Sequence, residues 1–216
     1  MRIGVLGTGA AGRTIGAKLL ELGHEVHMGA RSPDNENAIA WADEGGEGAG
    51  HGTFADAAGL GEVLFNCTAG AASIDALTAA GEANLSGKLL IDVANPLDFS
   101  QGMPPTLTIA NDDSLGERIQ KTFPAARVVK ALNTVNCEVM VDPASVPGDH
   151  VVFICSEDVG AKDEAGRLLA SFGWPPDRVI DLGGIRAARA TEMYLPLWVN
   201  LMQELGTARF NLTIMK

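Results

Sequence analysis

Three glycines near the N-terminus have the spacing of a phosphate-binding turn. The segment reads GxGxxG, with the residues Gly7, Thr8, Gly9, Ala10, Ala11 and Gly12, and it lies between a hydrophobic strand and a helical pattern. Gly7 would allow the tight turn, Gly9 would let the backbone approach a pyrophosphate, and Gly12 would let the helix pack closely on the strand. Free N–H groups at the start of the helix would face the phosphate charge. The alternative is a plain strand–turn–helix without a ligand.

The end of the next strand favours NADP(H) over NAD(H) as the dinucleotide. NAD-binding proteins carry Asp or Glu there, about 20 residues beyond the glycines, to hold the ribose hydroxyls. This chain has Ala30, Arg31 and Ser32 instead. A carboxylate that would repel a 2′-phosphate is absent, and Arg31 can bind that phosphate through two charge-assisted hydrogen bonds. Thr8 and Ser32 could donate further bonds, whereas a solvated surface arginine is the alternative.

The sequence offers no acid–base pair to carry out catalysis. It shows no Ser-His-Asp order, no HExxH and no paired carboxylates, and its histidines fall in loops or at strand edges, at His24, His27, His51 and His150. Hydride transfer between two bound rings needs proximity and orientation more than an acid or a base. We therefore expect neither a catalytic side chain nor a metal site.

Lys130, Asn133 and Asn95 each admit two interpretations. Hydroxyacid dehydrogenases with a similar nucleotide-binding half use a lysine and an asparagine on a helix to protonate and hold the substrate oxygen. Here the two residues stand three apart at the end of a strand, which favours a structural role for Lys130 and a backbone-orienting role for Asn133. Asn95, held extended before Pro96, could touch a nicotinamide or cap its own turn.

Short apolar segments alternate with helical patterns along the chain, which is typical of a parallel sheet covered on both faces. The predicted strands are residues 3–7, 25–29, 51–54, 63–67, 89–93, 128–132, 151–155 and 179–182. The predicted helices are residues 10–22, 33–44, 71–80 and 158–172. The pattern predicts an α/β fold over residues 1–183, a doubly wound, mostly parallel sheet of the Rossmann NAD(P)-binding type.

Residues 184–216 read as one long helical segment that packs on this domain and bends at Pro196. Its apolar residues lie most of the way round the helix, which predicts two buried faces; they are Ile185, Tyr194, Leu195, Trp198, Leu201, Met202, Leu205 and Phe210. One face can cover the domain, and the other suggests a homodimer contact. A helix buried within one subunit would look similar.

Composition excludes several classes of partner. Acidic residues outnumber basic ones by 27 to 16, so the net charge is -11, and an acidic protein lacks the basic stripe that nucleic acids and anionic membranes need. The cysteines Cys67, Cys137 and Cys155 are odd in number and form no CxxC pair, which argues against disulfides and zinc. With no signal peptide and no apolar run near the roughly 20 residues that span a bilayer, we expect a cytoplasmic protein.

Several segments resemble those of the deazaflavin-dependent NADP oxidoreductases. The resemblance lies in residues 7–9, 22–26 and 30–31, and more specifically in Asp-Val-Ala-Asn-Pro-Leu at 92–97 and Val-Lys-Ala-Leu-Asn-Thr at 129–134. It runs over nearly the whole chain. The resemblance implies a small homodimeric protein that passes hydride between NADPH and 8-hydroxy-5-deazaflavin, coenzyme F420. The same module is the reductase domain of membrane ferric reductases, where it donates electrons to flavin.

The resemblance also implies site residues. It puts the pyrophosphate on Thr8, Gly9, Ala10 and Ala11, and the 2′-phosphate on Ala30 and Arg31, where alanine replaces a family serine. A basic residue common a few positions later is Asn35 here, which weakens the phosphate clamp, and Ser32 could compensate. The positions that face the nicotinamide are Thr68, Ala69, Ala94, Asn95, Asn133 and Cys137, at the strand ends where open α/β sheets hold ligands.

The expected reaction is hydride transfer between NADP(H) and F420. The second ring would lie in a shallow apolar cleft under the C-terminal segment, with Met193, Leu197 and Trp198 as candidate walls. One alternative keeps NADPH and replaces the deazaflavin by FMN, FAD or a small imine or carbonyl compound. Another is a protein that senses NADP without turnover.

Overall fold

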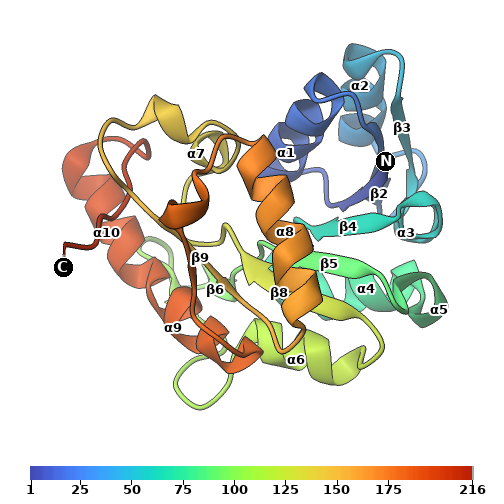
Figure 1. The fold of residues 1–216 in the computed structure, drawn as a ribbon. Coiled ribbons are helices and arrows are strands. Elements are labelled where there is room, and N and C mark those ends of the chain that lie inside the picture. Colours follow the sequence, from blue (N-terminus) through green and yellow to red (C-terminus); the bar gives the residue numbers. More distant parts are fainter. Residues whose placement is uncertain (216) are drawn as a thin grey trace.

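The computed structural model describes residues 1–215, whose eight-stranded main sheet lies between two layers of helices (Figure 1). Within these residues the sheet has the order β10-β9-β8-β5-β4-β1-β2-β3. Neighbours from β3 to β8 are parallel, whereas β9 is antiparallel to β8 and parallel to β10. The strands are β1 Arg2–Leu6, β2 Glu25–Ala30, β3 Ala49–Thr53, β4 Val63–Asn66, β5 Leu89–Asp92, β8 Arg127–Ala131, β9 Val152–Cys155 and β10 Val179–Asp181.

Each face of the sheet has its own apolar core. One core contains residues of α1 Ala10–Glu21, α2 Glu36–Gly45, α7 Cys137–Val141 and α8 Val159–Ser171. The other contains residues of α3 Phe54–Leu60, α4 Ser73–Ala80, α5 Glu82–Leu85 and α6 Leu115–Thr122. Strand residues alternate between the two, since Val63 and Phe65 belong to the first core and Leu64 to the second. The structure thus confirms the doubly wound α/β fold.

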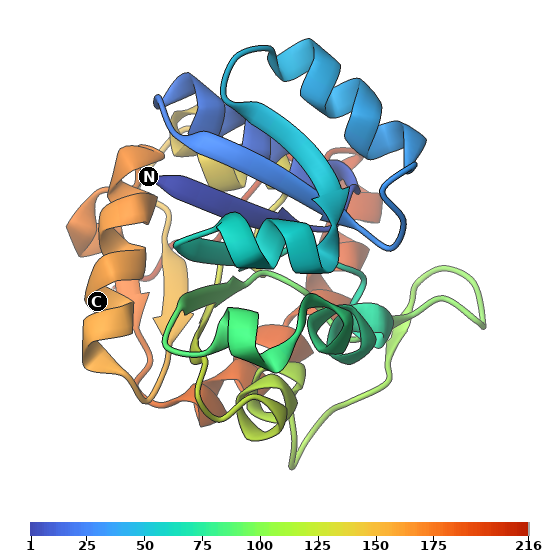
Figure 2. The ribbon, with the colours of Figure 1, turned by 90° about the vertical axis from the view of Figure 1, so that its right-hand side faces the viewer.

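Short elements connect these layers. The two-stranded hairpin of β6 Leu97–Asp98 and β7 Thr106–Leu107 carries a loop that projects from the body of the molecule, drawn in light green in Figure 2. The 3₁₀ turns are η1 Gly70–Ala72, η2 Pro143–Ser145, η3 Pro176–Arg178 and η4 Ile185–Ala187. None of the helices in residues 1–215 is long and apolar enough to cross a membrane.

The C-terminal segment is helical over only part of its predicted length. It contains α9 Ala188–Met193 and α10 Leu195–Leu205, which meet just before Pro196. Gly206 ends α10 in the left-handed conformation, with φ of 65°, a common way for helices to stop. Residues 207–215 continue without a helix, and Leu212 O accepts a bond from Val151 N at 3.0 Å. The prediction of one helix over 184–216 was therefore wrong beyond Leu205, and Lys216 lies outside the described residues.

Four helices, α3, α5, α6 and α7, escaped prediction, although α3 and α6 begin with a Ser or Thr capping signal. The expected strand at 51–54 ends at Thr53, whose hydroxyl accepts a bond from Asp56 N while Asp56 bonds back to Thr53 N, and α3 begins there. Ser114 and Glu117 hold the start of α6 in a related way. A Ser or Thr followed three residues later by an acidic residue could have revealed both.

Gly16 lets α2 pack against α1. A Cβ atom at Gly16 would lie 2.7 Å from the Trp41 ring, and the Trp41 indole N–H donates to Arg13 O at 3.2 Å. Since Trp41 is buried in the core, α1 and α2 can approach only because this position has no side chain.

Gly16→Ala should therefore destabilise the protein by about 1–3 kcal/mol, because Trp41 must move out of its packed position. The matched control is Gly166→Ala in α8, where a Cβ atom would meet nothing within 4 Å and should stabilise by about 0.4–1 kcal/mol. Urea unfolding of the two variants measures both effects. Shifts of the same sign would contradict the packing argument.

Candidate dinucleotide site

An open cavity of ≈ 670 Å³ lies at the carboxyl ends of β1, β2 and β4. The predicted residues that line it are Gly7, Thr8, Gly9, Ala30, Arg31, Thr68 and Ala69. Sites at this edge are the rule for open α/β sheets. These seven predicted residues thus lie around one cavity, on both sides of β1.

The glycines of the loop differ in what requires them. Gly7 has φ of +116°, and a Cβ atom there would lie 2.6 Å from Cys67 O. A Cβ atom at Gly12 would lie 2.1 Å from Gly7 O, whereas one at Gly9 would meet nothing within 4 Å. The protein's own packing therefore excludes side chains at Gly7 and Gly12, and Gly9 faces open space that a ligand can fill.

The start of α1 presents unused hydrogen-bond donors. Its N-cap, Gly9, has no side chain to cap it, and its first turn holds no acidic residue. Arg13 N is bonded to Gly9 O, so the N–H groups of Ala10, Ala11 and Gly12 have no intrahelical partner. Three backbone donors and the positive end of the helix dipole are thus available to an anion.

Positive charge stands at the end of β2. Arg31 is exposed and forms no ion pair with any side chain of residues 1–215. The Ser32 hydroxyl accepts a bond from Asp34 N at 3.3 Å, which leaves its proton free to donate. Asn35 also lines the cavity, but its side-chain oxygen caps α2 by accepting from Ala38 N.

The loops after β4, β5 and β8 meet beside the cavity. Asn95 Nδ2 donates to Asn133 O at 2.8 Å, and Asn133 Nδ2 donates to Asn95 Oδ1 at 2.9 Å. Leu132, although buried, has a left-handed φ of 62°, which is unusual for a bulky residue. A Cβ atom at Gly70 would lie 2.1 Å from Asn95 O. Asn95 and Asn133 thus form one reciprocal amide pair, with Ala94 next to it in the chain.

The remaining predicted residues do not line this cavity. Ala10 and Cys137 line a separate open region of ≈ 930 Å³ between α1, α2 and α7. Ala11, Gly12, Ser32 and Ala94 line neither region. The structure therefore brings together two groups, the seven cavity residues and the Asn95–Asn133 pair, and leaves Cys137 apart from both.

Sequence reasoning missed one wall of the cavity. It is formed by Phe54 at the start of α3, by Asp75, and by the small residues Ala72, Ala76 and Ala79. The alanines recur at helical spacing of four and three residues, a signal that could have indicated a close approach. Phe54 gave no signal, because it was expected at the end of a strand.

Lys130, Cys67 and Cys155 are buried, and of these three only Cys67 lines the cavity. The Lys130 side chain is fully buried, 2.8 Å from Asp92 Oδ2 and 2.8 Å from Glu192 Oε1. Burial disfavours its charge, but the two carboxylates outweigh burial and raise the pKa of Lys130. Burial also raises the pKa of the Cys67 thiol, and that of Cys155 to about 12. These groups therefore keep their protons near neutral pH.

Known proteins resemble this chain over most or all of its length. A family model described as NADP oxidoreductase, coenzyme F420-dependent, matches residues 2–96. An F420-dependent NADP reductase of Methanothermobacter marburgensis is 32% identical over 212 residues, which cover 93% of this chain and 92% of that protein. A crystal structure from Arthrobacter sp. FB24, provisionally assigned as an F420-dependent NADP reductase, is 52% identical, has a TM-score of 0.95 and covers 100% of both chains.

A more distant relative is longer than this chain. The metalloreductase STEAP3 of Rattus norvegicus is 26% identical over 202 residues, which cover 91% of this chain and 38% of that protein. The chain thus spans well under half of that relative's length. The 32% identity over nearly all of the methanogen protein shows the family and the reaction class. The chain belongs to the family of coenzyme F420-dependent NADP oxidoreductases and is an NADP-dependent oxidoreductase.

Proposed function

We propose that this enzyme transfers a hydride between NADP(H) and a deazaflavin of the F420 type bound beside the nicotinamide. The observation that carries the proposal is a cavity with backbone donors and a free arginine, where Asp75 is the only carboxylate among the described lining residues. NADPH supplies the hydride itself, so the protein has only to hold two rings in contact. The names of the whole-length relatives point to the same second substrate.

The glycine loop and the end of β2 would hold the phosphates of NADP(H). The open N–H groups of Ala10, Ala11 and Gly12 face a pyrophosphate in this proposal, with Thr8 beside them and Gly7 and Gly9 keeping the loop close. Arg31 and Ser32 bind the 2′-phosphate. Ala30, with only 3% of its surface exposed, offers little beyond its backbone.

The strand-end loops would hold the nicotinamide. Thr68 and Ala69 follow β4, Ala94 and Asn95 follow β5, and Asn133 follows β8. Thr68 Oγ1 donates to Asn66 Oδ1 at 2.7 Å and Asn95 is paired with Asn133, so these polar groups are held in place before a ligand binds. Cys137 lies with Ala10 in the separate region between α1, α2 and α7. In this proposal it therefore forms only part of the wall beside the nicotinamide.

The C-terminal segment offers apolar surface for the second ring. Met193 and Leu197 are 39% and 55% exposed, unusually high for such side chains. Trp198 differs, because its ring stacks on Phe210 at 5.4 Å between centroids and so belongs to the packing of the C-terminal tail. We therefore assign the wall of the second-substrate cleft to Met193 and Leu197 and leave Trp198 out.

An absorbance assay with NADPH and oxidised deazaflavin tests the reaction. The visible absorbance of the deazaflavin should disappear at a rate proportional to enzyme, and FMN, FAD and a cyclic imine should react far more slowly as parallel acceptors. Turnover with FMN or FAD alone would replace the deazaflavin by a flavin. Tight NADPH binding without turnover of any acceptor would instead indicate a sensor.

Arg31→Ala should raise the KM for NADPH by about 10- to 100-fold and leave kcat unchanged, since a charged hydrogen bond contributes about 1.5–3 kcal/mol. The KM for NADH, which has no 2′-phosphate, should not change. Arg167→Ala, at an exposed position of α8, is the control and should match the wild type. Steady-state kinetics with both dinucleotides measure the effect, and an equal loss with NADH would refute the phosphate contact.

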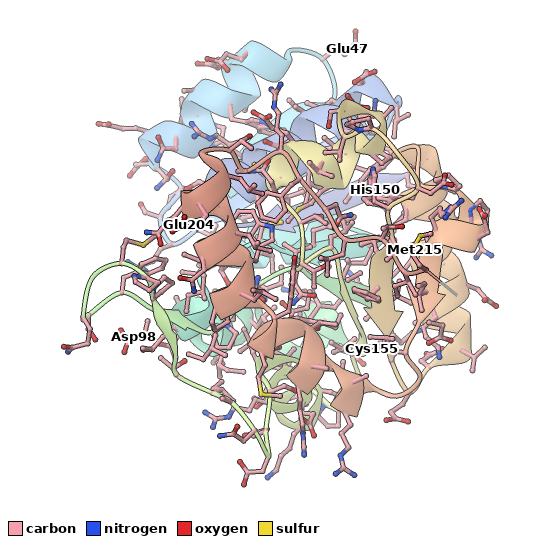
Figure 3. All side chains as sticks on the ribbon, turned by 90° about the vertical axis from the view of Figure 1, so that its left-hand side faces the viewer. Glu47, Asp98, His150, Cys155, Glu204 and Met215 are labelled. Atoms are coloured by element: carbon pink, nitrogen blue, oxygen red, sulfur yellow. The ribbon has the colours of Figure 1, made fainter. Side chains whose placement is uncertain are left out.

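We also propose that the protein is a homodimer. Leu197, Leu201 and Leu205 recur every four residues on one face of α10, and Leu197 and Leu205 are more than half exposed. The hairpin adds exposed Phe99 and Met103, and Figure 3 shows Glu204 of α10 and Asp98 of the hairpin on the same side of the molecule. An apolar surface of this kind marks a protein contact.

Leu201→Glu combined with Leu205→Glu should convert the dimer to a monomer, because buried unpaired carboxylates oppose association. Light scattering after size-exclusion chromatography gives the mass. The control is Val159→Glu, which changes an exposed apolar residue on α8 and should leave the dimer intact. A wild-type protein with the mass of a monomer would refute the homodimer proposal and leave the proposed hydride transfer unaffected.

The cysteines favour a reducing compartment. Cys67, Cys137 and Cys155 all carry free thiols. Disulfides persist in oxidising compartments and are rare in the cytosol. We therefore propose that the protein works in the cytoplasm.

A further inference from the structure

A chain of buried polar side chains runs from the cavity to the C-terminal segment. Thr68 at the cavity bonds to Asn66, and Asn66 Nδ2 donates to Asp92 Oδ1 at 2.8 Å. Lys130 then joins Asp92 to Glu192, with 2.8 Å to each carboxylate. Side chains from β4, β5, β8 and α9 are thus connected without a gap.

Glu192 ties α9 to two other elements. Besides Lys130, its carboxylate accepts bonds from Leu115 N at 2.8 Å and Gly116 N at 3.0 Å, the first two residues of α6. A carboxylate at a helix N-terminus interacts favourably with the helix dipole. One side chain that is only 1% exposed therefore connects α9 to both β8 and α6.

The same charges hold the backbone that enters the nicotinamide region. Lys130 Nζ donates to Ala94 O, and Ala94 N donates to Asp92 Oδ1 at 3.2 Å. Asn95, the next residue, is locked to Asn133. An ammonium group has three protons, and Lys130 directs them to Asp92, Glu192 and Ala94, which leaves none for a substrate.

Stability alone gives little reason for such an arrangement. Replacing a buried ion pair by apolar side chains of similar volume is often neutral or stabilising, whereas removing one partner is strongly destabilising. What a buried charge cluster does provide is a set of short, directional contacts at definite distances. Here those contacts relate the end of β5 to the helix that carries Met193.

We propose that Lys130, Asp92 and Glu192, the Lys130 network, are positioning residues that set the distance between the nicotinamide end of the cofactor and the second-substrate wall on α9 and α10. This inference rests on the proposed function, because the wall was assigned there. NADPH binding relies on Arg31 and the start of α1, so it should be nearly independent of the network. Binding and reduction of the second substrate should depend on it.

The test uses a variant that keeps the buried charge unchanged. Lys130→Met combined with Glu192→Gln removes one positive and one negative charge, so the cluster carries one net negative charge before and after. The matched control is Arg189→Met with Glu117→Gln, because this pair also joins α9 to α6, at 2.6 Å, but near the surface. If the first variant does not fold, Glu192→Gln alone leaves a balanced Lys130–Asp92 pair.

In the network variant, kcat/KM for the deazaflavin should fall roughly 10- to 100-fold, the range that a misplacement of about 1 Å can cause. The Kd for NADPH, measured by fluorescence, should stay within about 2-fold, and the surface variant should match the wild type in both. Unchanged deazaflavin kinetics in a folded network variant would overturn the inference. So would a loss of NADPH affinity as large as the kinetic loss.

Hydrogen exchange separates this inference from the proposed function. If the wild type does not reduce the deazaflavin, the proposed function fails, and exchange of the amides of residues 188–193 with and without NADP⁺ then tests the network. NADP⁺ should slow their exchange in the wild type and the surface variant, but not in the network variant. Equal slowing in all three proteins, or none in the wild type, would refute the coupling.

Discussion

The arrangement of the site depends on backbone segments that touch where no side chain would fit. Cβ atoms at Gly12, Gly7 and Gly70 would lie 2.1, 2.6 and 2.1 Å from the carbonyl oxygens of Gly7, Cys67 and Asn95. These contacts hold α1 and the loops after β1, β4 and β5 against one another. A methyl group at any of them would push two loops apart, and the donors at the start of α1 would no longer face the same space as the strand ends.

Beneath these loops, polar side chains of three neighbouring strands are joined to one another. Asn66, Asp92 and Lys130 are buried in successive strands of the sheet, and each finds partners in the next. A buried polar group without a partner is costly, so such a chain has few alternative arrangements. By contrast, Tyr194 and Trp198 on the C-terminal segment each keep a buried polar atom without a partner in residues 1–215. Buried hydrogen bonds therefore fix the arrangement of the strand ends more completely than that of the helical segment facing them.

Local patterns predicted the parts of this structure that local forces decide. The glycine loop and the strands of the sheet follow from spacing and apolar runs, and the structure confirms them. The end of α10 at Gly206 was missed because the apolar pattern continues past it to Phe210 while the backbone turns left-handed. The Lys130 network could not be predicted from the sequence, for a different reason. Its carboxylates stand 38 residues before and 62 residues after Lys130 in the chain, and no periodicity relates them.

Gly9 differs from the other glycines of the loop in a way that concerns selection. Its φ of -74° suits any residue, and a side chain there would touch no protein atom within 4 Å. The fold would accept alanine at this position as readily as glycine, whereas it would reject alanine at Gly7 and Gly12. Selection for stability therefore does not favour glycine at residue 9, whereas the proposed close approach of a phosphate to the backbone would favour it. At this position a mutation could abolish binding and leave a protein that folds, accumulates and passes every test of structural integrity.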